Sequence, residues 1–285
     1  MILNETYTLS NGVKIPKLGL GTWEISDDTV AQAVKEAVAI GYRHIDTAQG
    51  YSNERGVGEG IRTCGVKREE IFVTTKLEAE IKNYADTVKA IDGSLQQLGL
   101  DYIDLMIIHA PKPWSQYDRD DRHFEGNLEA WRALEEAYTT GKLRAIGLSN
   151  FQIVDIKNIL ENGIVKPTVN QILTHISNTP FELIDYCQQN DILVEAYSPI
   201  AHGELLKNEE VKKIAEKYNA SVPQLAIRYC LELGLLPLPK SINPKNIKSN
   251  TEVDFTISAE DMETLKNVES IKDYGKFSHF PVFWK

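Results

Sequence analysis

The chain has 285 residues, of which 42% are hydrophobic and 25% charged, as in an ordinary folded globular protein. Its net charge of −10 predicts that it binds neither nucleic acid nor an anionic membrane surface, because their phosphates would repel it. The three cysteines form no C-x-x-C pair, the start lacks the features of a signal peptide, and no apolar stretch approaches the length of a membrane span. We therefore expect a cytoplasmic protein without a disulfide framework.

The N-terminal segment predicts a β-hairpin. Two short alternating runs in YTLSNGVKIP, residues 7–16, are joined by Asn11 and Gly12. An Asn-Gly pair between such runs is the strongest short-range signal for a hairpin turn.

Beyond this hairpin, short apolar runs rich in strand-forming residues alternate with segments of helical periodicity. Val30, Val34, Ala37 and Val38 follow the i, i+4, i+7, i+8 spacing of one helix face. Many helical segments end at a glycine, as helices commonly do. Eight strands are predicted in this pattern, at residues 17–21, 42–48, 71–77, 102–109, 143–150, 168–172, 192–199 and 235–241.

Strands that lack a clean alternation and are each followed by a helix are typical of parallel strands buried on both faces. Eight such units predict a (β/α)8 TIM barrel, with residues 1–285 as one domain. The rival is an open, doubly wound sheet. If it bound a dinucleotide, such a sheet would usually carry a G-x-G-x-x-G turn, which neither GLGTWE (19–24) nor GVGEGI (56–61) supplies.

Two segments interrupt the strand–helix pattern. Residues 112–126 form a long charged connection after the fourth predicted strand, which is more often only a solvated excursion. The tail from Lys272 carries five aromatic residues. Because exposed apolar groups seek cover, we expect this tail to fold back near the barrel mouth.

Polar side chains stand at the ends of the predicted strands. Taken singly, each has an ordinary explanation, such as a helix cap, a solvated strand end or a core histidine. Capping and solvation give no reason for an acid, a base and a cation on consecutive strands. We therefore interpret the set as one site: Asp46, Lys76, His109, Ser149, Asn150, Gln171, Tyr197 and Lys240.

Four residues predict a proton donor beside a polarised carbonyl group. The phenol of Tyr51 has an ordinary pKa near 10, which a neighbouring Lys76 ammonium would lower. Asp46 would fix this lysine and keep it charged, and His109 would orient a carbonyl oxygen by a hydrogen bond. The set lacks a nucleophile, so another group must deliver electrons or attack.

Other chemistries fit these residues less well. The six histidines are scattered and no H-E-x-x-H motif occurs, so we predict no metal site. The segment GLSNF, residues 147–151, departs from the G-x-S-x-G elbow of serine hydrolases at Phe151. A Schiff-base aldolase that uses Lys76 stays an alternative, although a paired Asp46 would work against it.

Seven segments, in order over nearly the whole chain, resemble the aldo-keto reductase family: GYRHIDTAQGYSNE, VTTK, YIDLMIIHAP, GLSNF, NQI, AYSP and PKS. The likeness leans toward the bacterial 2,5-diketo-gluconate and glyoxal reductase branch. The resemblance implies a (β/α)8 barrel that binds NADPH without a Rossmann fold and reduces an aldehyde or ketone by hydride transfer. It implies Tyr51 as the general acid, Lys76 and Asp46 as its tuning pair and His109 as the orienting group.

The resemblance also implies the cofactor contacts. Ser149, Asn150 and Gln171 would hold the nicotinamide carboxamide, with Tyr197 stacked on its ring. Other positions would meet the pyrophosphate, the 2′-phosphate and the adenine. The whole implied set for NADPH is Gly21, Thr22, Ser149, Asn150, Gln171, Tyr197, Ser198, Leu205, Lys240, Ser241 and Asn250.

Two positions depart from the family's pattern near the expected 2′-phosphate site. Asn246 stands where an Arg is usual, and Ser249 stands where a Glu is usual. Loss of the Arg removes a fork that suits a phosphate. Because Lys240, Lys245 and Lys248 remain nearby, we still predict a preference for NADPH over NADH.

Trp23, His109 and Ala110 are the implied substrate-binding residues. Ala110 stands where the family often has an aromatic residue, which should widen that wall of the pocket. Trp114, and the tail residues Phe280 and Trp284, are expected to pack rather than to contact substrate. We expect a monomer that reduces small aldehydes, 2-oxoaldehydes or keto sugars. The alternative from another class is a catalytically silent regulatory subunit that binds NADP.

Overall fold

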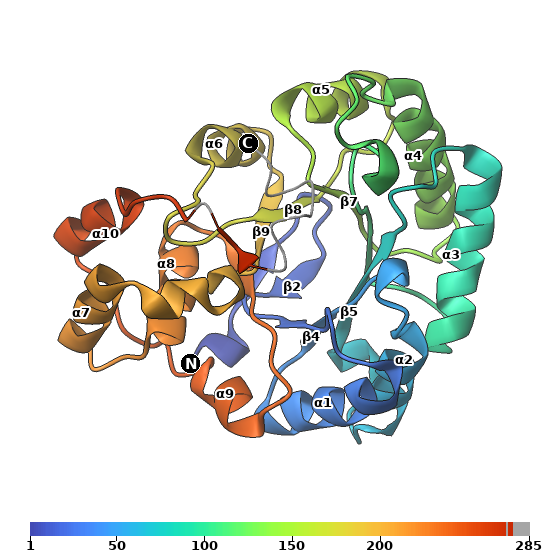
Figure 1. The fold of residues 1–285 in the computed structure, drawn as a ribbon. Coiled ribbons are helices and arrows are strands. Elements are labelled where there is room, and N and C mark those ends of the chain that lie inside the picture. Colours follow the sequence, from blue (N-terminus) through green and yellow to red (C-terminus); the bar gives the residue numbers. More distant parts are fainter. Residues whose placement is uncertain (272, 276–285) are drawn as a thin grey trace.

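The computed structural model describes residues 1–271 and 273–275 (Figure 1). Within them, eight parallel strands form one sheet whose spatial order follows the chain. Their bounds are β3 Leu20–Gly21, β4 His44–Asp46, β5 Phe72–Leu77, β6 Leu105–Ile108, β7 Ile146–Ser149, β8 Val169–Leu173, β9 Leu193–Tyr197 and β10 Leu236–Leu238.

The first and last strands of this sheet meet. Gly21 forms a parallel bridge with Lys240, and the backbone N–H groups of Gly19 and Gly21 donate to the carbonyl oxygens of Pro237 and Pro239. These contacts turn the sheet into a barrel, which confirms the predicted TIM-barrel fold.

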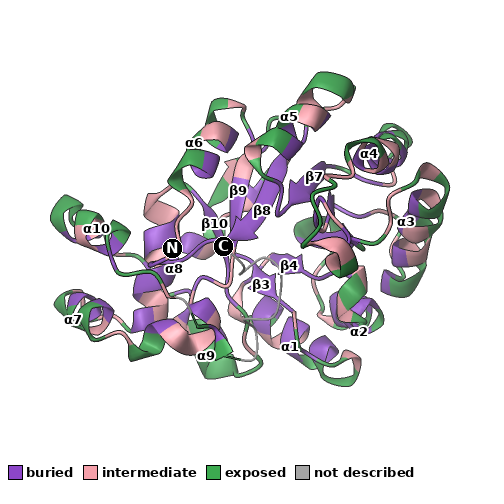
Figure 2. Ribbon diagram, turned by 45° about the horizontal axis from the view of Figure 1, so that its top comes forward, coloured by how far each residue is buried: buried purple, intermediate pink, exposed green. Residues whose placement is uncertain are grey.

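Helices surround the barrel, and Figure 2 shows their buried faces turned toward the strands. Val30, Val34, Ala37 and Val38 are all buried, as their spacing predicted. The helices are α1 Asp27–Ile40, α2 Glu54–Thr63, α3 Tyr84–Leu98, α4 Phe124–Thr139, α5 Ile153–Asn162, α6 Phe181–Gln189, α7 Glu209–Lys217, α8 Val222–Glu232, α9 Pro244–Ser249 and α10 Ala259–Lys266. Short 3₁₀ turns are η1 Ile2–Asn4, η2 Gln49–Tyr51, η3 Arg68–Glu70, η4 Trp114–Gln116 and η5 Ala201–Lys207. In the described part of the chain, no helix has the length and apolarity needed to cross a membrane.

The N-terminal hairpin is confirmed. Strands β1 (Thr6–Thr8) and β2 (Lys14–Pro16) pair antiparallel, and Gly12 adopts a φ of 86° in the turn. Leu9 and Ile15 of the hairpin belong to the same hydrophobic cluster as Phe72 and Leu105. Because these two residues begin β5 and β6, the hairpin covers the end of the barrel opposite the polar strand ends.

Glycines in α2 fix the helix that follows the Tyr51 turn. A Cβ atom on Gly58 would overlap the backbone of Leu98 in α3, and one on Gly56 would overlap the carbonyl oxygen of Asp27 in α1. The pattern GVGEGI therefore serves close helix packing, which explains glycines at a spacing that does not suit a nucleotide-binding turn.

The predicted strands run longer than the observed ones at several ends; the run at 235–241, for example, narrows to Leu236–Leu238. The predicted fold-back of the tail, including Phe280 and Trp284, lies outside the described residues. Tyr274, which is described, is buried, and its hydroxyl group pairs with His175 Nε2 at 3.1 Å.

Candidate active site

Lys76 lies inside the barrel at the end of β5 and is completely buried. Its Nζ atom donates to Asp46 Oδ1 at 2.5 Å and to the carbonyl oxygen of Thr47 at 2.8 Å. Burial alone would lower the pKa of Lys76, but the Asp46 carboxylate and the nearby Tyr51 outweigh it and hold this pKa above its usual value. Lys76 is therefore a protonated ammonium group, which does not fit the nucleophilic amine of a Schiff-base aldolase.

Tyr51 ends the η2 turn directly beside this ion pair. Lys76 Nζ lies 4.8 Å from the centroid of the Tyr51 ring, and the His109 ring lies 5.8 Å from it in an edge-to-face arrangement. The structure thus brings together all four residues of the predicted proton-donor set.

The pKa of Tyr51 corrects one expectation. Lys76 does lower it, but withdrawal from solvent raises it by more and Asp46 adds to the rise, so the pKa of Tyr51 lies above 10. The phenol therefore keeps its proton at neutral pH. Sequence reasoning counted the charged neighbour and did not count the burial of the ring.

Two amide side chains fix the turn that carries Tyr51. Gln49 Nε2 donates to Ser94 Oγ at 2.8 Å, and Gln49 Oε1 accepts from the backbone N–H of Glu78 at 3.0 Å. On the other side of Tyr51, Asn53 Nδ2 donates to the carbonyl oxygen of Thr22 at 3.0 Å. The turn is thereby tied to α3, to the segment after β5 and to the segment after β3.

His109 follows β6 and carries a neutral ring. Burial, with additional repulsion from the Lys76 and Lys82 ammonium groups, places the pKa of His109 well below its ordinary value. A neutral imidazole has one N–H to donate and does not add a second cation beside Lys76.

The connection 112–126 supplies aromatic rings to this side of the site. The Trp114 ring packs edge-on against His109, with centroids 5.5 Å apart, and Tyr117 stacks on Trp114 at the same separation. The connection is therefore more than a solvated excursion. Ala110 is completely buried, and its carbonyl oxygen accepts from Lys82 Nζ at 2.7 Å.

The residues expected at the carboxamide gather on β7, β8 and β9: Ser149 and Asn150 at the end of β7, Gln171 in the middle of β8 and Tyr197 at the end of β9. Ser149 Oγ donates to the carbonyl oxygen of Gln171 at 2.9 Å. Asn150, which has a φ of 61°, donates from Nδ2 to the carbonyl oxygen of His109 at 3.0 Å and accepts from the Tyr197 hydroxyl group at 2.9 Å. Tyr197 is half-buried at the end of β9.

The segment after β3 and the segment after β9 meet at the mouth of the barrel. Trp23 packs edge-on against His202, with centroids 5.4 Å apart, and Ser198 Oγ lies 3.2 Å from His202 Nε2. Leu205, which was expected to touch the cofactor, has its side chain completely buried in the core. The structure therefore does not support a contact between Leu205 and the cofactor.

Gly21 and Thr22 lie where the segment after β3 meets β4 and β10. A Cβ atom on Gly21 would lie 3.2 Å from the carbonyl oxygen of Leu238, so a larger residue would crowd this seam. Thr22 Oγ1 donates to the carbonyl oxygen of Asp46 at 2.9 Å.

The residues expected at the adenosine end lie before α9, within it and at its C-terminal end. Lys240, Lys245 and Lys248 are exposed, and Ser241 Oγ accepts from the backbone N–H of Asn243 at 3.1 Å. Asn250 is buried at the end of the helix. Three exposed ammonium groups beside one loop suit a doubly charged phosphate.

Sequence reasoning missed Glu195, which is completely buried in the middle of β9, and His44 in β4. A charged residue within the apolar run ILVEAYSP was the available signal. Glu195 stands in the middle of its strand, whereas the predicted site residues were those at strand ends.

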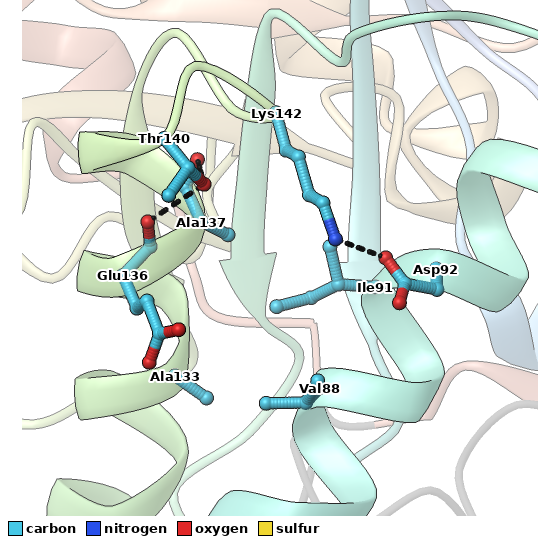
Figure 3. A pocket seen from close by; sticks show the side chains of 8 residues that line it. All are labelled: Val88, Ile91, Asp92, Ala133, Glu136, Ala137, Thr140 and Lys142. Atoms are coloured by element: carbon cyan, nitrogen blue, oxygen red, sulfur yellow. Dashed lines mark hydrogen bonds and ion pairs between the residues drawn. The ribbon is translucent and has the colours of Figure 1, made fainter.

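Cavities elsewhere on the surface do not mark this site. A cavity of about 40 Å³ lies between α3 and α4 on the outer layer of helices (Figure 3). Its volume has room for only a few water molecules. A cleft of about 240 Å³ lies beside the hairpin, at the opposite end of the barrel.

Comparison with known proteins identifies the family. The family model described as the aldo/keto reductase family matches residues 17–270. The chain belongs to the aldo/keto reductase family. It is 43% identical over 265 residues to the glyoxal reductase of Bacillus subtilis, covering 92% of each chain.

Solved structures agree with this assignment. An aldo/keto reductase from Brucella melitensis superposes with a TM-score of 0.87 at 40% identity, covering 93% of this chain and 98% of that one. An aldo-keto reductase from Bombyx mori, solved in complex with NADP, superposes with a TM-score of 0.84 at 35% identity, covering 96% and 95%. The expected family and fold are thus confirmed for this aldo/keto reductase.

Proposed function

We propose that this aldo/keto reductase catalyses the NADPH-dependent reduction of small aldehydes, 2-oxoaldehydes or keto sugars. Membership of the family supports the reaction class, and the likeness to a bacterial glyoxal reductase supports the 2-oxoaldehydes among the substrates. We further infer that the chain acts as a cytoplasmic monomer with a single barrel domain. The observation that carries the proposal is the meeting of Tyr51, Lys76, Asp46 and His109 at the barrel mouth.

The chain's own residues fit the two ends of such a cofactor. Ser149, Asn150 and Gln171 provide hydroxyl and amide groups, which match the donors and the acceptor of a carboxamide. At the other end, Lys240 and Lys245 are exposed and flank Ser241 in the sequence, and they suit the charge of a 2′-phosphate. The bound NADP of the Bombyx mori relative supports the same cofactor here.

NADPH supplies the hydride when it is bound. Tyr51 donates its phenolic proton to the carbonyl oxygen of the substrate, which becomes the alcohol. The tyrosinate left behind lies beside the Lys76 ammonium, whose charge stabilises it, and Asp46 keeps that ammonium in place. Neutral His109 donates its N–H to the carbonyl oxygen and orients it toward Tyr51.

A panel of carbonyl compounds, assayed with NADPH and NADH in parallel, tests the proposal. We expect oxidation of NADPH with at least one small aldehyde or 2-oxoaldehyde and slower oxidation of NADH. Quenching of tryptophan fluorescence by NADPH without oxidation by any compound would instead favour the regulatory subunit. Borohydride trapping of a substrate on Lys76 would favour the aldolase.

A further inference from the structure

Glu195 lies in β9 with its side chain directed into the barrel. The carboxyl group meets residues of both a neighbouring strand and a distant one. Its Oε2 atom accepts from Gln171 Nε2 of β8 at 2.7 Å, and its Oε1 atom lies 3.9 Å from His44 Nε2 of β4. Among the described residues, Glu195 Oε1 has no hydrogen-bond partner. The carboxyl group thus lies in the interior of the barrel between Gln171 and His44.

The amide nitrogen of Gln171 is fully used by two carboxyl groups. It carries two hydrogen atoms, and its partners are Asp46 Oδ2 at 2.8 Å and Glu195 Oε2 at 2.7 Å. Because both hydrogen atoms are engaged, the plane of the amide is fixed. The Oε1 atom of Gln171 is then the atom that the side chain can offer to a ligand, and it offers an acceptor.

The charges inside the barrel leave Glu195 neutral. Around it, the described residues contribute one ammonium group, Lys76, and this pairs with Asp46. His44 does not supply a second cation, because burial and Lys76 lower its pKa to about 3. From β10, the residue in register with Glu195 is the apolar Leu236. Burial and the Asp46 charge raise the pKa of Glu195 to about 8, against the lowering effects of Gln171 and Lys76.

We propose that Glu195 is a positioning residue of the cofactor site, which holds the Gln171 amide with its oxygen presented to the ligand and does so as an uncharged carboxyl group. This inference rests on the proposed function, because it takes the ligand of Gln171 to be the nicotinamide carboxamide. The nicotinamide ring is neutral in NADPH and positively charged in NADP⁺. Ionisation of Glu195 at alkaline pH therefore adds a negative charge that favours NADP⁺ over NADPH.

Three variants separate the hydrogen bond that Glu195 accepts from Gln171 from the ability of Glu195 to ionise. Glu195→Gln keeps an acceptor for Gln171 and cannot ionise, whereas Glu195→Leu keeps neither property. Glu54→Gln is the matched control, since Glu54 is also a buried carboxyl with a raised pKa but bonds to Thr75 on the outer face of β5. Circular dichroism and urea unfolding establish that each variant is folded.

Fluorescence titrations with NADPH and NADP⁺ then give the ratio of the two dissociation constants at each pH. Between about pH 7 and about pH 9.5, the ratio should shift toward NADP⁺ by about threefold or more in the unaltered chain and in Glu54→Gln. It should stay constant in Glu195→Gln. Glu195→Leu should bind NADPH about tenfold more weakly at neutral pH, because the Gln171 amide loses an acceptor.

A second readout needs no cofactor. The infrared carbonyl stretch of a protonated carboxyl group should be present at neutral pH and should weaken with a midpoint at about pH 8. In Glu195→Gln, the component of this band that disappears with that midpoint should be missing.

An equal pH shift of the binding ratio in the unaltered chain and in Glu195→Gln would overturn the proposal, as would full NADPH affinity in Glu195→Leu. If carbonyl reduction fails while these binding results hold, the proposed function is wrong and the role of Glu195 stands. If reduction is seen and the binding results fail, only this inference falls.

Discussion

Asp46→Asn tests the buried ion pair on which the candidate site is built. In the unaltered chain, Lys76 Nζ lies 2.5 Å from Asp46 Oδ1, and both side chains are almost completely buried. The variant leaves the ammonium group with a carbonyl oxygen of Thr47 and no counter-charge. The NH2 group of the new side chain must also point toward Lys76 or Gln171. Both of these neighbours are themselves hydrogen-bond donors, so this NH2 group has no acceptor there.

The expected cost follows from two limits. Removal of one partner from a buried ion pair destabilises a protein by about 3–5 kcal/mol. The destabilisation caused by the unpaired ammonium group has an upper limit, because beyond it Lys76 would lose its proton rather than stay charged. Neutralising an amine with an ordinary pKa of 10.5 at pH 7 costs about 5 kcal/mol. We therefore expect Asp46→Asn to lower the free energy of unfolding by about 3–5 kcal/mol at pH 7.

The stability of the unaltered chain and that of Asp46→Asn should depend differently on pH. The folded chain raises the pKa of Lys76, so its stabilising contribution is complete below about pH 10.5 and fades only as the pH rises through the higher folded value. In Asp46→Asn the folded pKa falls below the unfolded one, so the variant is penalised at neutral pH and recovers toward pH 10. The difference in stability should therefore shrink as the pH is raised.

Urea unfolding of the two chains between about pH 7 and about pH 10 measures this difference. Asp92→Asn is the control, because Asp92 and Lys142 form an exposed ion pair at 2.6 Å on the outside of the barrel (Figure 3). That variant should cost at most about 1 kcal/mol. Equal stability of Asp46→Asn and Asp92→Asn at neutral pH would contradict a stabilising role for the buried ion pair of Asp46 and Lys76.

Two further predictions concern the ends of the proposed site. Lys240→Ala should weaken NADPH binding by about tenfold and NADH binding far less, since Lys240 is the proposed partner of the 2′-phosphate, which NADH lacks; equal losses in fluorescence titrations would remove Lys240 from that contact. Trp114→Ala removes the ring that packs on His109 and should raise KM for aromatic or apolar aldehydes by about fivefold, while KM for NADPH stays nearly constant. An unchanged KM for every aldehyde would show that the packing of Trp114 on His109 does not affect substrate binding.

The fold was readable from sequence because its signals are local. The Asn11-Gly12 turn, the helix stripe of Val30 and Val34, and the succession of eight apolar runs each depend on neighbours within a few residues. Their closure into a barrel followed from the count of units. The ends of strands were less exact, since pairing with a neighbouring strand decides where each one stops.

The candidate site could likewise be predicted only where its residues are marked by local sequence signals. Asp46, Lys76 and His109 could be found because they stand at or near the ends of strands that must converge. Tyr51 stands in a turn, and it was found because the set needed a proton donor close to Asp46 and Lys76. The raised pKa of Tyr51 and the packing of Trp114 on His109 depend on burial and on contacts between segments distant in the chain. Glu195 was missed because it lies in the middle of β9 rather than at a strand end.

Tyr51 is proposed to donate the proton to the carbonyl oxygen of the substrate. The variant Tyr51→Phe, assayed by NADPH oxidation with the best aldehyde of the panel, tests this role. The ring stays and only the hydroxyl group is removed, so NADPH affinity should be nearly unchanged, while kcat falls by about 10²- to 10⁴-fold, the usual contribution of a positioned acid. A kcat close to that of the unaltered chain would contradict the assignment.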